Sequence, residues 1–510
     1  MVAAGILLSR LVGLVRVRVF AHYFGESAAA DAFNAAFRIP NFLQNLFGEG
    51  VLSASFIPVY ARLNAEKRHE EATDLAEAVF GLLLLTTTVI VTLGVLTTPW
   101  LIDLIAPGFK GDKRLLTITL VRILFPGAGL LVMSAWCLGI LNSHRKFFLS
   151  YAAPVVWNVM MIAALVWQGP RRHEAVLAQI LAWASVAGSA AQILAQMPVV
   201  VRFLWPIRLR LHLATEHIRT VVRNFFPVLV SRGVVQISGY IDQWLGSFLP
   251  TGAVAALSYA QMLYLLPVSL FGMSVSAAEL PVMSSALGSA EEIAAILRQR
   301  LARGLEQISY FVVPSAAAFL VLGDVVVATI YRSGKFGAAD VTYVWGVLAG
   351  SAIGLLASTS GRLYSSAFYA LRDTRTPLNF ALIRVALTFG LGYWCALKAP
   401  ALLHIDSRWG VAGLTLSAGV AGWLEFLLLR WSLHRRIGVV TYSLARVVKL
   451  WTAALFAAAA GFGLKLILPV HHAVIVGICV LGSYGTIYLL IAQLFGVSNI
   501  GDAVRALRRR

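Results

Sequence analysis

Long apolar runs, broken only by Pro, Gly and clusters of charged residues, recur from one end of the 510-residue chain to the other. Hydrophobic residues make up 59% of the chain and charged residues only 13%, whereas a soluble domain carries about 25% charged residues. No soluble fold hides this much apolar surface, so the bilayer must be the solvent for most of the chain. The composition therefore predicts an all-α integral membrane protein, with no cleavable signal peptide.

The number of membrane-spanning helices follows from the lengths of these runs, because one span needs about 20 mostly apolar residues. Fourteen runs qualify, and the first two are the least apolar. They cover roughly 2–23, 31–61, 73–102, 115–142, 147–168, 174–203, 218–249, 253–285, 296–322, 340–371, 376–398, 410–433, 443–467 and 471–495. We therefore expect about 14 transmembrane helices.

The basic residues orient these spans, because cytoplasmic connections carry an excess of Lys and Arg. With the N-terminus in the cytoplasm, 24 of the 42 Lys and Arg residues fall on the cytoplasmic side, 9 on the opposite side and 9 inside spans. This asymmetry predicts an even number of spans with both termini cytoplasmic. Because the basic residues punctuate apolar runs rather than forming one solvated stripe, the net charge of +19 does not indicate a nucleic-acid partner.

Similar features recur in the two halves of the chain. The second span carries FRIPN at 37–41 and the eighth carries YLLPVSLFG at 264–272, while basic turns follow the fourth and tenth spans at 142–146 and 371–375. Transporters are often built from two such repeats, with the substrate between them. We therefore expect two six-helix lobes around a central cationic cavity, and a C-terminal helix pair that packs against lipid or forms a groove for a lipid tail. The expected boundaries are 1–205 for the N-lobe, 206–438 for the C-lobe, and 439–510 for the pair and a basic cytoplasmic tail.

Four arginines lie within the first two apolar runs: Arg10, Arg16, Arg18 and Arg38. A charge at the centre of a spanning helix costs roughly 2.5–3.5 kcal/mol, so such residues usually face a bundle interior or a wet cavity. A cationic cavity implies an anionic passenger. Arg10 and Arg16 lie about 120° apart around a helix, and Gly13 between them would let a partner helix or a headgroup approach.

Guanidinium groups suit phosphate oxygens, so Arg10 and Arg16 are candidate ligands of a pyrophosphate. The alternative is a structural role, in which they pair with Asp31 or Glu49 or reach toward the membrane interface. Arg18 is more typical of an interfacial residue.

Polar residues of the second span add further candidates. Asp31 would cap its own helix, or act as a gate by pairing with an arginine of the first span. Pro40 frees a backbone carbonyl, and Asn41 would either satisfy that backbone or contact a sugar. Arg38 is a third candidate cation for the substrate. Glu49 is a candidate ion-coupling carboxylate or a partner for Arg16.

Arg232 and Asp242 lie ten residues apart in the seventh span, about 80° apart around a helix, so both could line one cavity. Asp242 is a candidate coupling-cation site or a member of a buried pair. Arg362 and Arg384 are most simply interhelical or interfacial cations. The chain has no GxxxxGK[ST], HExxH or GxSxG motif and no clustered Cys and His, so we expect no enzyme activity, no catalytic residues, no cofactor and no metal.

Several longer stretches occur in order along nearly the whole chain. They are SRLVGLVR at 9–16, DAFNAAFRIPNFLQNLFGEG at 31–50, GILNSHRKFFLSYAAPVVWN at 139–158, YAQMLYLLPVSLFGMSVSAAELP at 259–281 and FYALRDTRTP at 368–377. By these stretches the chain resembles the MurJ (MviN) family of lipid II flippases, in the multidrug/oligosaccharidyl-lipid/polysaccharide exporter superfamily. The resemblance implies alternating-access transport of undecaprenyl-pyrophosphate-linked MurNAc-pentapeptide-GlcNAc to the outer leaflet of the bacterial cytoplasmic membrane, for peptidoglycan synthesis and cell shape.

The resemblance also implies partners and exposes departures. The implied partners are lipid II, membrane lipids, a coupling cation or the membrane potential, and cell-wall synthesis proteins. Charged residues common in the family are replaced here by Val17, Gln44, Asn45, Gln261 and Met262. The change at Met262 removes one expected phosphate ligand, for which Arg232 is a candidate substitute. The alternatives are a flippase for another polyprenyl-linked saccharide, a cation-coupled drug extruder, or a non-transporting scaffold.

Overall fold

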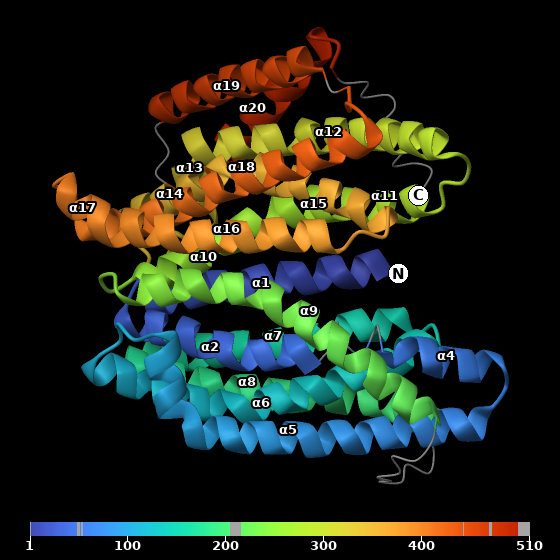
Figure 1. Ribbon diagram of the computed structural model, residues 1–510. Coiled ribbons are helices and arrows are strands. Elements are labelled where there is room, and N and C mark those ends of the chain that lie inside the picture. The colour runs from blue at the N-terminus through green and yellow to red at the C-terminus, as the bar shows by residue number, and fades with distance from the viewer. Residues whose placement is uncertain are drawn as a thin grey trace. The chain divides into compact units, whose positions relative to one another are not determined.

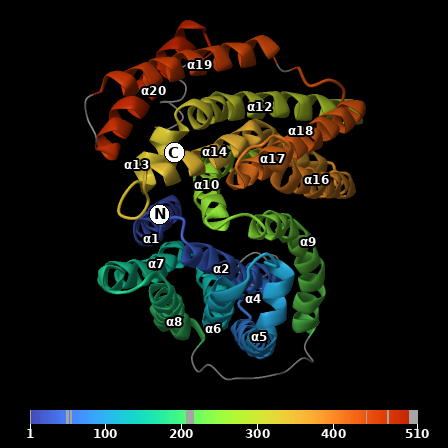
Figure 2. The same ribbon diagram turned by 90° about the vertical axis from the view of Figure 1, so that its left-hand side faces the viewer.

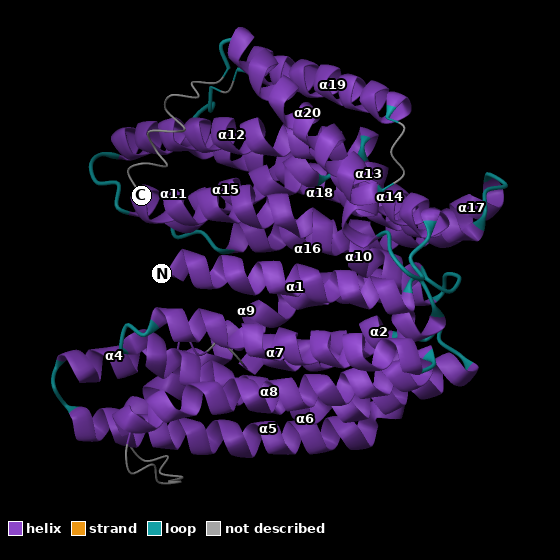
Figure 3. Ribbon diagram, turned by 180° about the vertical axis from the view of Figure 1, so that it is seen from behind, coloured by secondary structure: helices purple, strands orange, loops and turns teal. Residues whose placement is uncertain are grey.

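A computed structural model describes residues 2–47, 52, 55–204, 216–441, 443–468 and 472–497, without the side chains of 2–7, 39–40, 216–217, 224 and 226–238. These residues are almost entirely helical and form no β-strand; one isolated bridge joins Ser333 and Phe336 (Figures 1 and 3). The chain divides into two compact units, Met1–Ala255 and Ala256–Arg510. The predicted all-α membrane fold is confirmed.

Eight α-helices lie wholly within the described part of the first unit. They are α1 (Val2–Phe24), α2 (Ala28–Phe47), α4 (Ile57–Ala65), α5 (His69–Ile105), α6 (Gly111–Ser143), α7 (Phe147–Gln168), α8 (Glu174–Leu204) and α9 (Glu216–Ser247). Within the predicted second span, 31–61, α2 ends at Phe47 and α4 begins at Ile57, and most of the residues between them lie outside the described ranges.

The centre of the first unit is α6, which packs against α2, α5 and α8, while α7 packs against α1 and α8 (Figure 2). Lipid tails are as apolar as leucine, so polar contacts help to hold membrane helices together. Here Trp136 donates a hydrogen bond of 3.1 Å to the Ala76 carbonyl of α5, and buried Ser134 contacts Gln192 and Gln196 of α8. Helix α9, expected to open the C-lobe, packs against α2 and α5. The three-part division of the chain stays a prediction.

The second unit holds the remaining helices. They are α10 (Ala253–Pro267), α11 (Ser274–Ser284), α12 (Ala290–Val321), α13 (Gly323–Tyr331), α14 (Ala338–Ile353), α15 (Leu355–Ala370), α16 (Arg375–Tyr393), α17 (Ala399–Leu402), α18 (Gly410–Ile437), α19 (Leu444–Ile467) and α20 (Ala473–Leu494), with α10 beginning just before the division. A π-helical segment, Val268–Met273, follows Pro267 and joins α10 to α11. Proline has no N–H to donate, so the predicted interruption of this span has a local cause.

Close approach of helices marks the centre of the second unit, where α18 packs against α14, α15 and α16. A Cβ added to Gly354, between α14 and α15, would lie 2.5 Å from the Gly419 Cα of α18. Only glycine allows this backbone contact, as is common where membrane helices cross.

The C-terminal pair, α19 and α20, packs on α12 and α13. Alanines of α19, among them Ala453 and Ala457, are fully buried against α12. The hydroxyls of Tyr484 and Tyr488 donate hydrogen bonds of 2.6 Å to the carbonyls of Pro314 and Tyr310. The pair is therefore an integral part of the second unit's packing.

Ten of the helices in the described ranges are long and apolar enough to cross a membrane, or eleven if α14 and α15, bent by 41°, form one broken span. The helices α1, α2 and α9, which are 23, 20 and 32 residues long, are not among these ten. The protein is a multi-pass membrane protein, and the count of fourteen stays a prediction.

Three basic residues end their helices in the same left-handed backbone conformation. The φ angles of Lys67, Arg145 and Arg372 are 59°, 59° and 60°. In the repeated basic turns, Arg145 N–H and Arg372 N–H donate to the carbonyls of Asn142 and Tyr369, and the next N–H in each turn reaches one residue further back. This is the hydrogen-bond pattern that usually has glycine at the left-handed position. The two basic turns noted in the sequence thus share one turn geometry, which also occurs at Lys67 and His404, and the internal repeat stays a prediction.

Candidate functional site

Arg16 lies among aromatic side chains within the first unit. Its guanidinium carbon lies 4.8 Å from the ring centroid of Trp157 on α7 and 5.5 Å from that of Phe37 on α2. The two rings stack on each other, with centroids 5.7 Å apart. One guanidinium N–H also points to the Met161 sulfur at 3.5 Å. Arg16 forms no ion pair with any described carboxylate, so aromatic faces hold its charge in place without neutralising it.

Arg10 and Gly13 lie on the same helix, about two turns and one turn before Arg16 respectively. Arg10 is exposed, and a Cβ added to Gly13 would meet no atom within 4 Å. A step of about 100° per residue places Gly13 midway between Arg10 and Arg16 around α1. This face, defined by Arg10, Gly13 and Arg16 and called the open face of α1 below, therefore combines two cations with free space.

Arg38 faces α9. Its Nη1 donates a hydrogen bond of 2.6 Å to the Gly239 carbonyl, and the Tyr240 hydroxyl donates one of 3.0 Å to the Arg38 carbonyl. The charge of Asp242 acts on Arg38 as well. The structure thus brings together two predicted site residues, Arg38 and Asp242, and gives Arg38 a structural role in the packing of α2 against α9. Asn41 is half-buried one turn further along α2.

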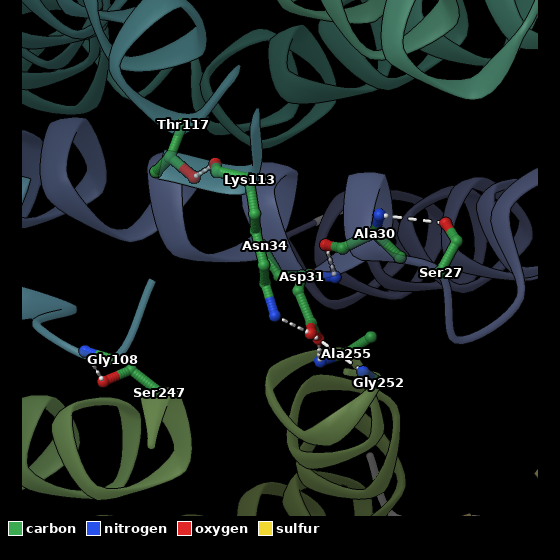
Figure 4. A network of polar contacts seen from close by, with 10 residues as sticks. All are labelled: Ser27, Ala30, Asp31, Asn34, Gly108, Lys113, Thr117, Ser247, Gly252 and Ala255. Carbon is green, nitrogen blue, oxygen red and sulfur yellow. Dashed lines mark hydrogen bonds and ion pairs between the residues drawn. The ribbon is translucent and has the colours of Figure 1, made fainter. Parts of the chain in front are cut away.

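Asp31 is fully buried near the start of α2 and accepts three hydrogen bonds (Figure 4). Its carboxylate pairs with the Lys113 ammonium of α6 at 2.5 Å and accepts the backbone N–H groups of Gly252 and Ala255, each at 2.8 Å. The predicted partner, an arginine of the first span, is wrong, because the described ion pair is with Lys113. The predicted capping is right in kind, but the helix that Asp31 caps is α10; its own helix uses Ser27, which accepts the Ala30 N–H.

The surroundings of Asp31 close this end of the first unit. Ala35, Ala106, Phe109 and Val254 form a small buried apolar cluster, and Lys113 Nζ lies 4.2 Å from the Phe109 ring centroid. Nearby, the Gly108 N–H donates to the Ser247 hydroxyl at 3.1 Å. A carboxylate shielded from water with three donors is strongly held, because each charge-assisted bond is stronger than a neutral one.

Two predicted site residues, Glu49 and the side chain of Arg232, lie outside the described residues. In the second unit, Met262 is half-buried on α10. Arg384 of α16 pairs with Glu425 of α18 at 3.1 Å, which is the interhelical role expected for it. Lys465 pairs with Asp324.

The residues that contact Arg16 and Asp31 were not predicted from the sequence. Trp157 and Phe37 lie inside the quoted stretches, but nothing in their spacing pairs them with Arg16. Lys113 follows the APGF turn that marks the end of the third span. In the described part of the chain no three His, Cys, Asp or Glu side chains lie close enough together to hold a metal ion.

Two helical units, a proline-interrupted span and an arginine on a long apolar helix that pairs with no described carboxylate are the features of a polytopic membrane transporter. The family model described as "Lipid II flippase MurJ" matches residues 20–485, and the chain belongs to this family.

Individual relatives agree with this assignment. The chain is 33% identical over 441 residues to the lipid II flippase MurJ of Burkholderia cenocepacia, covering 84% of this chain and 82% of the relative. The solved structure titled "Lipid II flippase MurJ, inward closed conformation" has a TM-score of 0.79 at 23% identity and covers 97% of this chain and 98% of its own. An inward-facing MATE multidrug transporter of the MOP superfamily shares the fold at a TM-score of 0.64 and 18% identity, covering 84% and 95%.

Proposed function

We propose that this protein flips lipid II, the undecaprenyl-pyrophosphate-linked peptidoglycan precursor, from the inner to the outer leaflet of the bacterial cytoplasmic membrane. The observation that carries the proposal is Arg16, an intramembrane cation that stacks on Trp157 and Phe37 and has no described carboxylate partner. An unneutralised arginine in a spanning segment is favourable only if an anion or water meets it. Family membership supplies the identity of that anion.

The charged head of such a lipid crosses about 30 Å of hydrocarbon badly. Arg10 and Arg16 would bind the two phosphates, and the free space at Gly13 would admit them. The polyprenyl tail stays in lipid while the site is exposed to the two sides of the membrane in turn. Arg16 is fixed by its aromatic neighbours, so it loses little side-chain entropy when the head binds.

Arg38 and Asp242 make a second part of the proposal. Arg38 already donates to the Gly239 carbonyl, so we assign it to shaping the site, with Asn41 beside it as a sugar contact. Asp242 interacts electrostatically with Arg38. We propose Asp242 as the coupling site, where a bound cation would compete with Arg38 for the carboxylate. Glu49 is the second candidate carboxylate, and Arg232 the candidate replacement for the family arginine at Met262.

Asp31 is the proposed gate residue. It joins α2, α6 and the start of α10 through one buried carboxylate. Breaking these contacts would release three donors at once, so this end of the first unit opens only when other partners replace them.

The remaining parts of the proposal concern topology and partners. The 24 basic residues on one side against 9 on the other support cytoplasmic termini in the inner membrane. The driving force is the membrane potential or an ion gradient, and proteins of cell-wall synthesis are the expected partners.

A depletion–rescue assay of lipid II export tests the proposal. R16Q should abolish rescue at normal expression, and R16K should rescue poorly because an ammonium lacks the planar fork and its stacking. R122Q is the matched control, since Arg122 is an exposed arginine of α6, and it should rescue fully.

Full rescue by both R10Q and R16Q would contradict the proposal that Arg10 and Arg16 bind the pyrophosphate. Failure of the unchanged chain, with export of another polyprenyl-linked saccharide instead, would assign the substrate differently. A drug extruder needs a cavity that attracts cations, which an unpaired arginine opposes.

A further inference from the structure

A cavity of about 400 Å³ lies within the second unit, and none of its described lining residues is discussed under the proposed function. Its walls come from α13, α14, α19 and α20. Asp324, Arg332, Thr342 and Lys465 supply polar side chains, and Val341 and Leu468 are among its apolar ones. The volume falls within the range of small-molecule sites.

The charges of the described lining residues do not cancel. Arg332 and Lys465 are cations, and Asp324 is the one carboxylate among them, so these residues carry one net positive charge. Asp324 binds Lys465 through Oδ2, whereas its Oδ1 is shielded from water and accepts no hydrogen bond from a described residue. The carboxylate therefore depends on Lys465 for its compensation and holds that ammonium at the cavity wall. Arg332 is exposed and forms no ion pair with any described residue, which leaves its charge for a ligand.

The cavity lies where helices end. Lys465 is in the last turn of α19, Ala473 begins α20, and Arg332 directly follows α13. The ends of spanning helices lie at the level of the lipid headgroups. An anion reaching this cavity from the membrane is therefore a phospholipid phosphate, with its glycerol and first acyl carbons against the apolar wall.

We propose that this cavity binds the headgroup of an anionic phospholipid, phosphatidylglycerol being the representative. The phosphate lies between Arg332 and Lys465, and its single negative charge matches the net charge of the site. A choline or ethanolamine headgroup would add a cation beside Lys465, where like charges repel. The site is distinct from the open face of α1, so its occupancy and lipid II export can be tested separately.

Native mass spectrometry of the full chain in detergent, with phosphatidylglycerol or phosphatidylcholine added, tests the proposal. The unchanged protein should retain phosphatidylglycerol about tenfold more strongly than phosphatidylcholine, because both lipids carry the phosphate but only choline adds a cation, which the net positive charge of the site repels. R332Q leaves the Asp324–Lys465 pair in place and should lose most of this preference. K398Q is the matched control, because Lys398 is an exposed cation of the same unit outside the cavity, and it should keep the preference.

A second variant tests the charge balance. D324N removes the carboxylate, so the preference for phosphatidylglycerol should rise where that variant folds. Equal retention of the two lipids by the unchanged protein, or an unaltered preference in R332Q, would overturn the assignment. Displacement of the lipid by inorganic phosphate at equal concentration would show a phosphate site that does not recognise lipid, and would also overturn it.

Discussion

Arg145 and Arg372 occupy the same left-handed turn, with φ angles of 59° and 60°, at the ends of α6 and α15. L-residues other than glycine are disfavoured there because Cβ crowds the backbone. Replacing either arginine by glycine should therefore stabilise the turn by removing this crowding, while one positive charge is lost at each turn.

We predict that R145G and R372G each stabilise the folded protein by about 1 kcal/mol. Reversible unfolding in mixed detergent micelles measures the change. R303G is the matched control, since Arg303 is an exposed residue inside α12, and it should destabilise by about 1 kcal/mol. The same sign for all three variants would show that the turn conformation does not govern the effect.

Because Gly354 lies so close to Gly419, we expect that adding a single methyl group at Gly354 strongly lowers the stability of the folded protein. G354A should destabilise the protein by about 1–3 kcal/mol, because the new Cβ meets backbone at 2.5 Å and not a movable side chain. G390A in α16 should be neutral or stabilising, since a Cβ there meets nothing within 4 Å. Thermal unfolding followed by circular dichroism compares the two, and equal midpoints would contradict the prediction.

The buried Asp31 should respond differently from an exposed aspartate. D31A leaves Lys113 and two backbone N–H groups without their acceptor, so we expect faster hydrogen exchange at Gly252 and Ala255 and about 1–3 kcal/mol of lost stability for each donor left buried. D103N is the control, because the Asp103 side chain is 54% exposed in its pair with Arg114. An exposed pair of this kind contributes about 0–1 kcal/mol. An unchanged rate of hydrogen exchange at the Gly252 amide in D31A would contradict the role of Asp31 as the cap of α10.

Asp373, in the turn between α15 and α16, predicts a pH dependence. The Thr376 backbone N–H first, then its hydroxyl and Arg436, lower the pKa of the Asp373 carboxyl. A carboxyl with a lowered folded-state pKa stabilises above its unfolded pKa of about 3.9, and this contribution disappears as the pH falls through the folded value. D373N should therefore unfold at a lower temperature than the unchanged chain at pH 7, and the difference should shrink as the pH falls below about 4. A difference independent of pH would assign the effect to packing.

Most of the fold can be predicted from the lengths of the apolar runs and from the residues in the turns between them. The predicted span 115–142 matches α6 closely, since spanning helices must be apolar, whereas the predicted span 340–371 is divided at Gly354 into α14 and α15. The second span was harder, because its polar residues hide the end of α2 at Phe47 and the start of α4 at Ile57.

The charged residues of the candidate site could be predicted from the sequence, but the residues that they contact could not. Arg16 and Asp31 are conspicuous as charges in apolar runs. Their environments depend on helices distant in the chain, so no local pattern pairs Arg16 with Trp157 or Asp31 with Gly252. Arg38, expected to bind substrate, instead donates to the Gly239 carbonyl, a contact that only the packing of α2 on α9 creates.

The space beside Gly13 has a consequence for inhibitor chemistry. A small rigid dianion could occupy the open face of α1 without displacing a helix, because no atom lies within 4 Å of a Cβ at that position. A bulkier residue at Gly13 that conferred resistance to such a compound would fill the same space that the natural headgroup needs. On the proposed function, a mutation that excludes such a compound would therefore also slow growth.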